Sequence, residues 1–359
     1  MKLAEIALEV IGGAGLFLKS TSLLLLTLFG FGTHSTFFGP VKYAILPQHL
    51  AENELLEGNA YVDASTFLAI LIGTIAGAKM VLISDGISIV TAALLLIAIA
   101  GYASSRQIPT APPPAADLKL SFHLYRDIKD LIQHTRKQQD VFLSIIGISW
   151  FWFVGAIFLA QFPPFTRDVL GADENVGALF LAMFAVGIGA GSILCSKLMK
   201  GLVHVEYVPL DAIGMSLFSY RLYASGSAQV PAIHSGLIDI YSFLRQPAGW
   251  RILLDLFGLA LCGGFYSVPL YTLLQQRAEK THCARAIACN NLMNALFMVI
   301  ASLLAIGLLE LKFTIPHIFL TVAILNSAAA CYIYLLLPFS GRCRFNTASA
   351  TEKGSSRYI

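Results

Sequence analysis

Residues 25–48 read LLTLFGFGTHSTFFGPVKYAILPQ, and residues 253–276 read LLDLFGLALCGGFYSVPLYTLLQQ. The two stretches align without a gap and are identical at nine of 24 positions, which include two phenylalanines, a glycine, a tyrosine and a glutamine. After a shift of three residues the similarity resumes in the pairs Asn59–Asn290, Asp63–Asn294 and Ala64–Ala295. A repeat of this length in apolar sequence indicates a duplicated helical bundle, an arrangement common among membrane transporters.

The composition places most of the chain in a membrane. Of the 359 residues, 57% are hydrophobic and 13% are charged, where soluble domains carry roughly 25% charged residues. Mean hydropathy is +0.72. Apolar runs such as 87–103, 141–162 and 315–337 are long enough to cross a bilayer core. Because backbone amides in lipid must bond within the segment, these runs predict helices. The fold class is therefore all-α integral membrane.

We predict ten spans, of which the first is short and the seventh is interrupted by charges. They cover residues 3–18, 21–46, 59–83, 86–104, 141–162, 175–196, 205–224, 250–274, 285–309 and 315–338.

The spans fall into two groups around a polar connection. We expect a four-span bundle at 1–104, a linker at 105–140, a six-span bundle at 141–339 and a polar tail at 340–359. The linker opens with a proline-rich stretch, which resists helix formation. The sequence SFHLYRDIKDLIQHTRKQQ follows, and its pattern favours an amphipathic helix on the membrane surface over a solvated connector.

Charge counts predict the orientation. With the linker in the cytoplasm, that side collects 16 lysines and arginines and the other side seven, so both termini are expected in the cytoplasm. The first repeat copy lies in spans two and three of the chain, whereas the second copy lies in spans four and five after the linker. If the halves are equivalent, about 10 of 12 spans are present and two further spans precede Met1.

Four stretches carry a family resemblance. They are FFGPVKYAILPQHL (37–50), ISWFWFVGAIFLAQFPPF (148–165), WRILLDLFGLALCGGFYSVPLYTLLQQR (250–277) and RAIACNNLMNALFMV (285–299). Together they resemble the lysophospholipid transporter family of the major facilitator superfamily, over about residues 2–338. In particular they are similar to the transporter module that many bacteria fuse to a glycerophospholipid acyltransferase and an acyl-carrier-protein synthetase.

The resemblance implies a six-plus-six helical bundle in the bacterial inner membrane. It implies import of lysophospholipid, chiefly lysophosphatidylethanolamine, for reacylation, with membrane lipids and those two enzymes as partners. The chain departs from the family at both ends, since two spans are lacking and residues 340–359 resemble neither a further helix nor an acyltransferase.

Lys42 is the first candidate site residue. It follows Gly39-Pro40 near the predicted cytoplasmic end of its span, where proline removes a helical hydrogen bond. A cation beside such a break suits an anionic phosphate headgroup, and intramembrane charge is costly unless it has a role. The alternative is a lysine that extends to the interface.

Asn59 and Asp63 are four residues apart and share one helix face. We expect Asp63 either to pair with Lys42 as an inner gate or to bind the ethanolamine ammonium, and we favour the pair. In the second half, the neutral candidates are Asn290, Asn291 and Asn294. Those asparagines either contact substrate or bond neighbouring helices.

Two further features have a structural alternative to a functional role. Tyr43 and Tyr271 occupy equivalent repeat positions and are either site residues or interfacial anchors. The Gly-x-x-x-Gly pairs at 73–77 and 187–191 predict close helix packing.

No enzyme chemistry is indicated. The chain has no Walker loop and no Gly-x-Ser-x-Gly elbow. Its eight histidines and six cysteines show no metal spacing, so we expect no catalytic residue, metal, cofactor or nucleic-acid partner. Two other functions stay open. The first is a general solute facilitator, and the lack of acidic residues in the middle of the spans argues weakly against coupling to protons. The second is a transport-inactive scaffold for the acyltransferase or synthetase.

Overall fold

The computed structural model describes residues 1–110, 132–133, 135–228, 236–279 and 283–340. Within these ranges the chain is helical throughout and has no β-strand beyond a single bridge between Ala172 and Ile238. The elements are α1 (Lys2–Phe17), α2 (Thr21–Ala44), α3 (Leu46–His49), α4 (Leu55–Met80), α5 (Gly86–Ser105), α7 (Gln139–Pro164), the π-helix η1 (Phe165–Val169), α8 (Glu174–Met199), the 3-10 turn η2 (Val205–Tyr207), α9 (Val208–Ser227), α10 (Ile240–Arg245), α11 (Pro247–Arg277), α12 (Cys283–Glu310) and α13 (Ile315–Ser340).

Each of the ten predicted spans is a long helix. Eight helices in the described ranges have the length and hydropathy needed to cross a membrane. The other two are α1, which has 16 residues, and α9, which carries Asp211 and Arg221. The short helices α3 and α10 were not predicted. The prediction of a surface helix falls mostly on residues 121–131, and that of a polar tail on 341–359, both outside the described residues.

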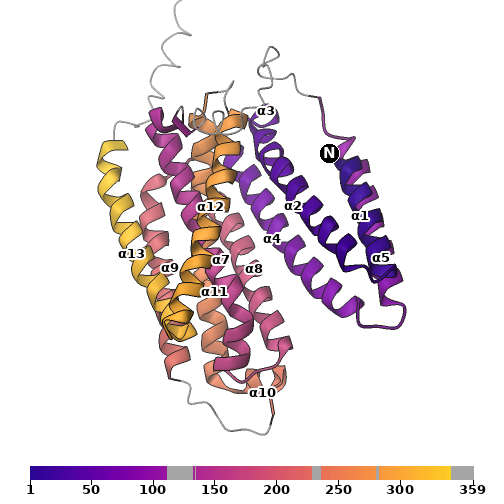
Figure 1. Cartoon of the computed structure of the whole chain (residues 1–359). Coiled ribbons are helices and arrows are strands. Elements are labelled where there is room, and N and C mark those ends of the chain that lie inside the picture. The colour runs from indigo at the N-terminus through magenta and orange to yellow at the C-terminus, as the bar shows by residue number, and fades with distance from the viewer. Residues whose placement is uncertain (111–131, 134, 229–235, 280–282, 341–359) are drawn as a thin grey trace, which may run out of the picture.

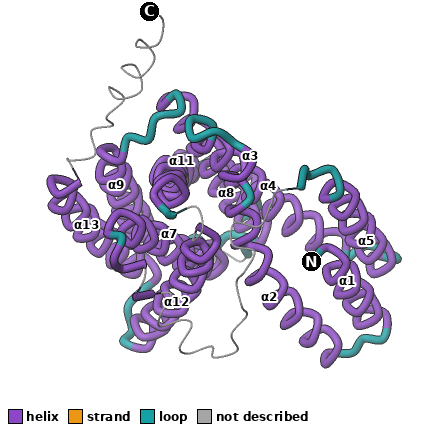
Figure 2. The backbone as a smooth tube through the Cα atoms, turned by 90° about the horizontal axis from the view of Figure 1, so that it is seen from above, coloured by secondary structure: helices purple, strands orange, loops and turns teal. Residues whose placement is uncertain are grey.

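The helices form two groups (Figures 1 and 2). In the C-terminal group α8 packs on α11, α9 on α13 and α7 on α12, whereas in the N-terminal group α1 packs on α2 and α5. The groups meet where α4 contacts α8 and α11, and where α2 contacts α12. The repeat therefore has a structural counterpart, because α2 and α4 of one group face α11 and α12 of the other.

The two copies of the repeat differ in burial. In its most apolar 18-residue window α2 is 6% buried, against 72% for α11. The side chain of Leu25 is 60% exposed and that of its equivalent Leu253 is 2% exposed. At this position the side chain of α2 is therefore exposed in the described structure, whereas that of α11 is covered by other helices. The two additional spans expected from the repeat remain a prediction.

One of the two Gly-x-x-x-Gly pairs packs closely. A methyl group on Gly187 would lie 2.8 Å from the carbonyl oxygen of Phe257, and one on Gly191 would collide with the carbonyl of Leu261. These glycines let α8 approach α11, as expected for small residues at a helix interface. At Gly73 and Gly77 a methyl group would meet nothing within 4 Å among the described residues.

This difference predicts opposite effects of the same substitution. Gly191→Ala must push α11 away from α8 and should destabilise the protein by about 1–3 kcal/mol, the usual cost of overpacking. Gly73→Ala is the matched control and should be neutral or stabilising, since alanine favours a helix over glycine by about 1 kcal/mol. Thermal unfolding of both variants in detergent tests the prediction. Equal melting temperatures would contradict the observed packing.

Candidate functional site

Most of the predicted site residues lie at one end of the bundle. This is the end at which α2, α8 and α11 finish and α4, α7 and α12 begin, and we call it the linker-side end because α5 ends and α7 begins there. Both α2 and α11 contain an internal proline, Pro40 and Pro269, shortly before this end. Each proline removes one backbone hydrogen bond from its helix. The two repeat copies thus bring a locally weakened helix to the same region.

The equivalent tyrosines of the repeat stack on each other. The ring centroids of Tyr43 and Tyr271 are 4.5 Å apart and the rings are almost parallel, with an interplanar angle of 6°. Both side chains are buried, at 6% and 2% exposed, so their interpretation as interfacial anchors is wrong. The stack joins α2 to α11 and hence the two halves of the molecule. The Tyr271 hydroxyl also accepts a hydrogen bond of 3.2 Å from the indole of Trp152.

Asp63 links the halves through its carboxylate. The Tyr43 hydroxyl donates to its Oδ1 at 2.8 Å, and the Ser267 hydroxyl donates to its Oδ2 at 3.1 Å. The side chain is 4% exposed. Hydrogen bonds to a buried carboxylate are of the charge-assisted type, which are roughly twice as strong as neutral ones. Asp63 on α4 therefore fastens the end of α2 and the middle of α11 together.

Lys42 does not form the expected ion pair with Asp63. Its ammonium donates to the Thr66 hydroxyl at 3.1 Å and lies 4.7 Å from the centroid of the Tyr43 ring. The reason is helical geometry: Lys42 and Tyr43 are consecutive and point about 100° apart, so when Tyr43 faces Asp63 the lysine points past it. Lys42 is half-buried. Two of its three N–H donors have no partner among the described residues.

Asn59 is at the centre of a second cluster between the halves. Its amide donates to the Thr272 hydroxyl at 3.1 Å and to the Gln275 side chain at 2.6 Å. Gln275 in turn donates to Asn59 at 3.1 Å and to the carbonyl of Tyr43 at 3.0 Å. Asn59 is fully buried. It shares a face with Asp63, as predicted, and that face meets α11.

Removing the Asn59 amide should destabilise this contact. Asn59→Ala leaves the buried side-chain oxygen of Gln275 without its donor, which costs about 1–3 kcal/mol, whereas the Thr272 hydroxyl still donates to the carbonyl of Val268. We expect a lower melting temperature in detergent. Asn175→Ala is the control, because the Asn175 side chain is exposed and bonds only to Asp173 in its own helix start. A melting temperature for Asn59→Ala equal to that of the control would contradict the assignment.

The three asparagines of α12 have different surroundings. Asn294 accepts a hydrogen bond of 2.8 Å from Ser149 on α7, so it bonds a neighbouring helix. The Asn291 amide lies beside Gly39, where an added methyl group would come within 2.5 Å of its nitrogen. Asn290, the repeat equivalent of Asn59, is fully buried, and its amide adjoins the Tyr271 hydroxyl without making a hydrogen bond of standard geometry to any described residue. Buried polar atoms usually have partners, which makes Asn290 a candidate ligand contact.

The contact between the halves is closed at the linker-side end. Among the described residues, the side-chain hydrogen bonds between helices α1–α5 and helices α7–α13 lie in the linker-side halves of α4 and α11, at the end of α2 or in the loop before α4. The last of these joins the Gln276 side chain to the carbonyl of Glu52 at 3.0 Å. Towards the opposite end, α2 and α4 lean away from the C-terminal helices in Figure 1.

The sequence did not identify several of these partners. Thr66, Ser267, Thr272 and Gln275 are ordinary polar residues whose role depends on how the helices are rotated. An ion pair was also missed: Arg221 on α9, whose side chain is 42% exposed, donates to the fully buried Asp255 on α11 at 2.6 Å. Asp255 lies well inside a candidate span. The expectation that proton coupling is absent remains a prediction.

The described residues contain no group of three or more His, Cys, Asp or Glu side chains that could hold a metal ion. The arrangement is instead a polar junction between two helical groups in an apolar molecule. Such a junction offers a charged ligand both a cation and a carboxylate.

Comparison with known proteins agrees with this description. The chain is 28% identical over 293 residues to the Lysophospholipid transporter LplT of Salmonella paratyphi B and, equally, to that of Salmonella newport. The match includes 79% of this chain, which spans 66% of the length of these relatives. No family model matches the chain.

A solved structure has the same fold. The crystal structure of a variant of the E. coli fucose:proton symporter FucP matches with a TM-score of 0.60, covering 93% of this chain and 83% of the other, at 13% identity. The relatives and this structural neighbour are transporters. The chain is thus a multi-pass helical membrane protein with a major-facilitator-type bundle, and it is similar over most of its length to lysophospholipid transporters.

Proposed function

We propose that the chain moves lysophospholipid, chiefly lysophosphatidylethanolamine, across the bacterial inner membrane. The observation that carries the proposal is the buried polar junction between the halves, which combines a cation, a carboxylate and an unpartnered amide inside a lipid-exposed bundle. A zwitterionic headgroup needs those groups, and its acyl chain needs the apolar surroundings. The similarity to LplT proteins supports the same substrate.

Each polar group has an assigned role. Lys42 binds the headgroup phosphate with its two unpartnered N–H donors, a charge-assisted contact. When the halves separate, Asp63 loses Ser267 and binds the ethanolamine ammonium, while Asn290 supplies its amide to the phosphate or glycerol oxygens. Tyr43, Tyr271 and Asn59 act as a gate, because they connect α2 and α4 to α11.

The direction follows from the predicted orientation. With both termini and the linker in the cytoplasm, the closed linker-side end faces the cytoplasm and the substrate enters from the outer side. Rocking of the two groups then moves the headgroup past the junction, as in alternating access. The imported lipid would be reacylated by an acyltransferase and acyl-carrier-protein synthetase, which we propose as partners at the cytoplasmic face.

Uptake into spheroplasts tests the substrate. Cells that express the chain should take up labelled lysophosphatidylethanolamine faster than cells without it, and unlabelled lysophospholipid should compete. A soluble sugar such as fucose should not compete. Uptake of a labelled sugar, with no lysophospholipid uptake, would favour a general solute facilitator. Absence of any uptake together with co-purification of the acyltransferase would favour a scaffold.

A further inference from the structure

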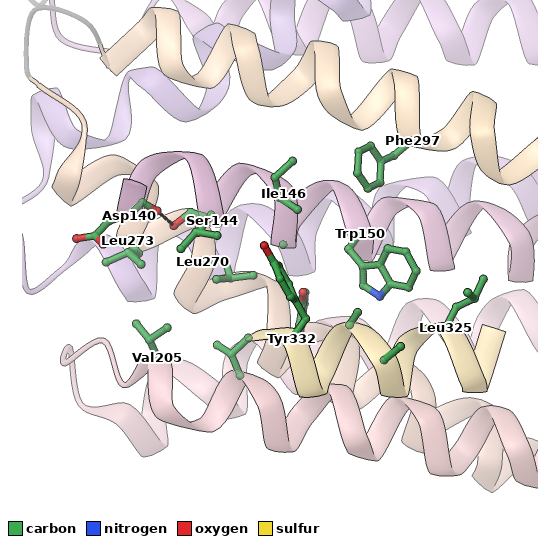
Figure 3. Close-up of a pocket in the computed structure, with 16 residues that line it drawn as sticks. Asp140, Ser144, Ile146, Trp150, Val205, Leu270, Leu273, Phe297, Leu325 and Tyr332 are labelled. Atoms are coloured by element: carbon green, nitrogen blue, oxygen red, sulfur yellow. Dashed lines mark hydrogen bonds between the residues drawn. The ribbon is translucent and has the colours of Figure 1, made fainter. Parts of the chain in front are cut away.

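An apolar groove lies in the C-terminal half, away from the polar junction. It has a volume of about 450 Å³, within the range of roughly 300–1,000 Å³ typical of ligand pockets. Figure 3 shows side chains of α7, α11, α12 and α13 around it. The residues that matter most here are Gly147, Trp150, Leu270, Phe297, Leu325 and Ala328.

The groove occupies one leaflet. Along α7 it extends from Asp140 to Trp150, ten residues, which at 1.5 Å per residue is about 15 Å. This is half of the hydrocarbon core, whose thickness is roughly 30 Å. Asp140 lies in the first turn of α7, and Val205 at the start of η2 lines the same end. The groove therefore begins at the linker-side end and finishes near the middle of the membrane.

Its polarity changes along this length. Asp140 and Ser144 stand together at the linker-side end, where the Ser144 hydroxyl donates to the Asp140 carbonyl at 2.8 Å. Further in, the lining is aliphatic and aromatic apart from the hydroxyl of Tyr266, which has no hydrogen-bond partner among the described residues. The Trp150 indole N–H is already donated to Asn326 at 2.7 Å, which leaves its ring as apolar surface. A molecule that fits must be polar at one end and apolar over about 15 Å.

The groove is distinct from the polar junction. Tyr266 and Leu270 line it, whereas their neighbours Ser267 and Tyr271 point to the junction. Helix α11 thus has one face in each site.

We propose that this groove binds the acyl chain of a lysophospholipid in the linker-side leaflet, with its headgroup beside Asp140. The identity of this lipid rests on the proposed function, of which it would be the product. Moving an acyl chain from the bilayer into the groove changes the hydrophobic free energy little, because lipid chains are as apolar as the lining. The shape of the groove must therefore select the ligand. A single-chain lipid places its whole chain inside. A two-chain lipid must hold its second chain against the outer edges of α12 and α13.

Photolabelling of the full chain in nanodiscs tests this. The probe is lysophosphatidylethanolamine with a diazirine near the end of its acyl chain, and the matched probe is diacyl phosphatidylethanolamine with the same labelled chain. We expect the single-chain probe to label Phe297, Leu325 and Ala328, as mapped by mass spectrometry, and the diacyl probe to label them much less.

A filled groove provides the matched variant. Ala328→Trp should reduce labelling of Phe297 about tenfold, because the larger side chain fills the groove and the probe must then displace it. A tenfold loss of affinity corresponds to roughly 1.4 kcal/mol. Ile324→Trp is the control, because Ile324 lies on the same helix, is 60% exposed and does not line the groove. If Ala328→Trp does not fold, Ala328→Leu and Ile324→Leu give the same comparison.

Two outcomes would overturn the proposal: labelling that the groove variants leave unchanged, and equal labelling by the diacyl probe. The experiment measures no transport, so its failure is separable from that of the proposed function. Groove labelling without uptake in spheroplasts would retain the binding site and remove the transport assignment. Uptake without groove labelling would retain the transport assignment and remove the binding site.

Discussion

Asp63→Ala should reduce lysophosphatidylethanolamine uptake by at least about tenfold, equivalent to roughly 1.4 kcal/mol. The substitution removes the acceptor for both the Tyr43 and the Ser267 hydroxyl. Each buried donor left unsatisfied costs about 1–3 kcal/mol, and both costs fall on the closed state of the linker-side end. It also removes the proposed contact with the ethanolamine ammonium. Uptake by spheroplasts, normalised to protein in the membrane, is the measurement.

Two further variants separate charge from hydrogen bonding. The Asp63→Asn variant retains an acceptor for the Tyr43 hydroxyl, so the junction should still close and the melting temperature should stay near that of the wild type. It lacks the negative charge that binds the ammonium, so its uptake should be low. Asp85→Asn is the control, because Asp85 precedes α5, is exposed and makes no side-chain cap bond. Normal uptake by Asp63→Ala would exclude Asp63 from the mechanism.

Lys42→Ala should reduce lysophosphatidylethanolamine uptake about as much as Asp63→Ala, but without destabilising the protein. Lys42 bonds only to Thr66 among the described residues, so the gate contacts of Tyr43, Asp63 and Asn59 remain. We expect little change in stability and a loss of uptake of about tenfold or more, because a charge-assisted bond to phosphate contributes roughly 1.5–3 kcal/mol. The loss should appear mainly as a higher half-saturating concentration of lysophospholipid.

The controls for Lys42 test charge and position. Lys42→Arg keeps the charge and should retain part of the uptake. Lys79→Ala removes an exposed lysine at the other end of α4 and should leave uptake unchanged. Equal uptake by Lys42→Ala and the wild type would show that Lys42 only extends to the membrane interface.

The sequence was sufficient to predict the fold. A bilayer accepts only helices for long apolar segments, so each apolar run became a helix within a few residues of its predicted bounds. The repeat was equally informative, because it placed α2 and α11 in equivalent positions. The stack of Tyr43 on Tyr271 pairs equivalent residues of the two copies, although the sequence did not predict that they touch.

Details of the site depend on information that no single helix carries. Lys42 and Asp63 are both charged and near the same span ends, yet the rotation of α2 directs Tyr43 to the carboxylate and leaves Lys42 beside Thr66. Gln275 and Asp255 act through partners more than 30 residues away in the chain. Their pairing depends on how α11 is rotated against α4 and α9, which a periodic pattern in apolar sequence does not determine.

The central claim is that lysophospholipid passes when the linker-side contact between the halves opens. Exposed Glu52 and half-buried Gln276 bridge this contact outside the buried cluster. With the six native cysteines replaced by serine, Glu52→Cys with Gln276→Cys should transport normally until a short, reversible bifunctional thiol reagent joins the two cysteines. Uptake should then fall to the level of cells without the protein and return after reduction, while each single-cysteine variant is unaffected by the reagent. Unchanged lysophosphatidylethanolamine uptake by the fully tethered protein would contradict the account.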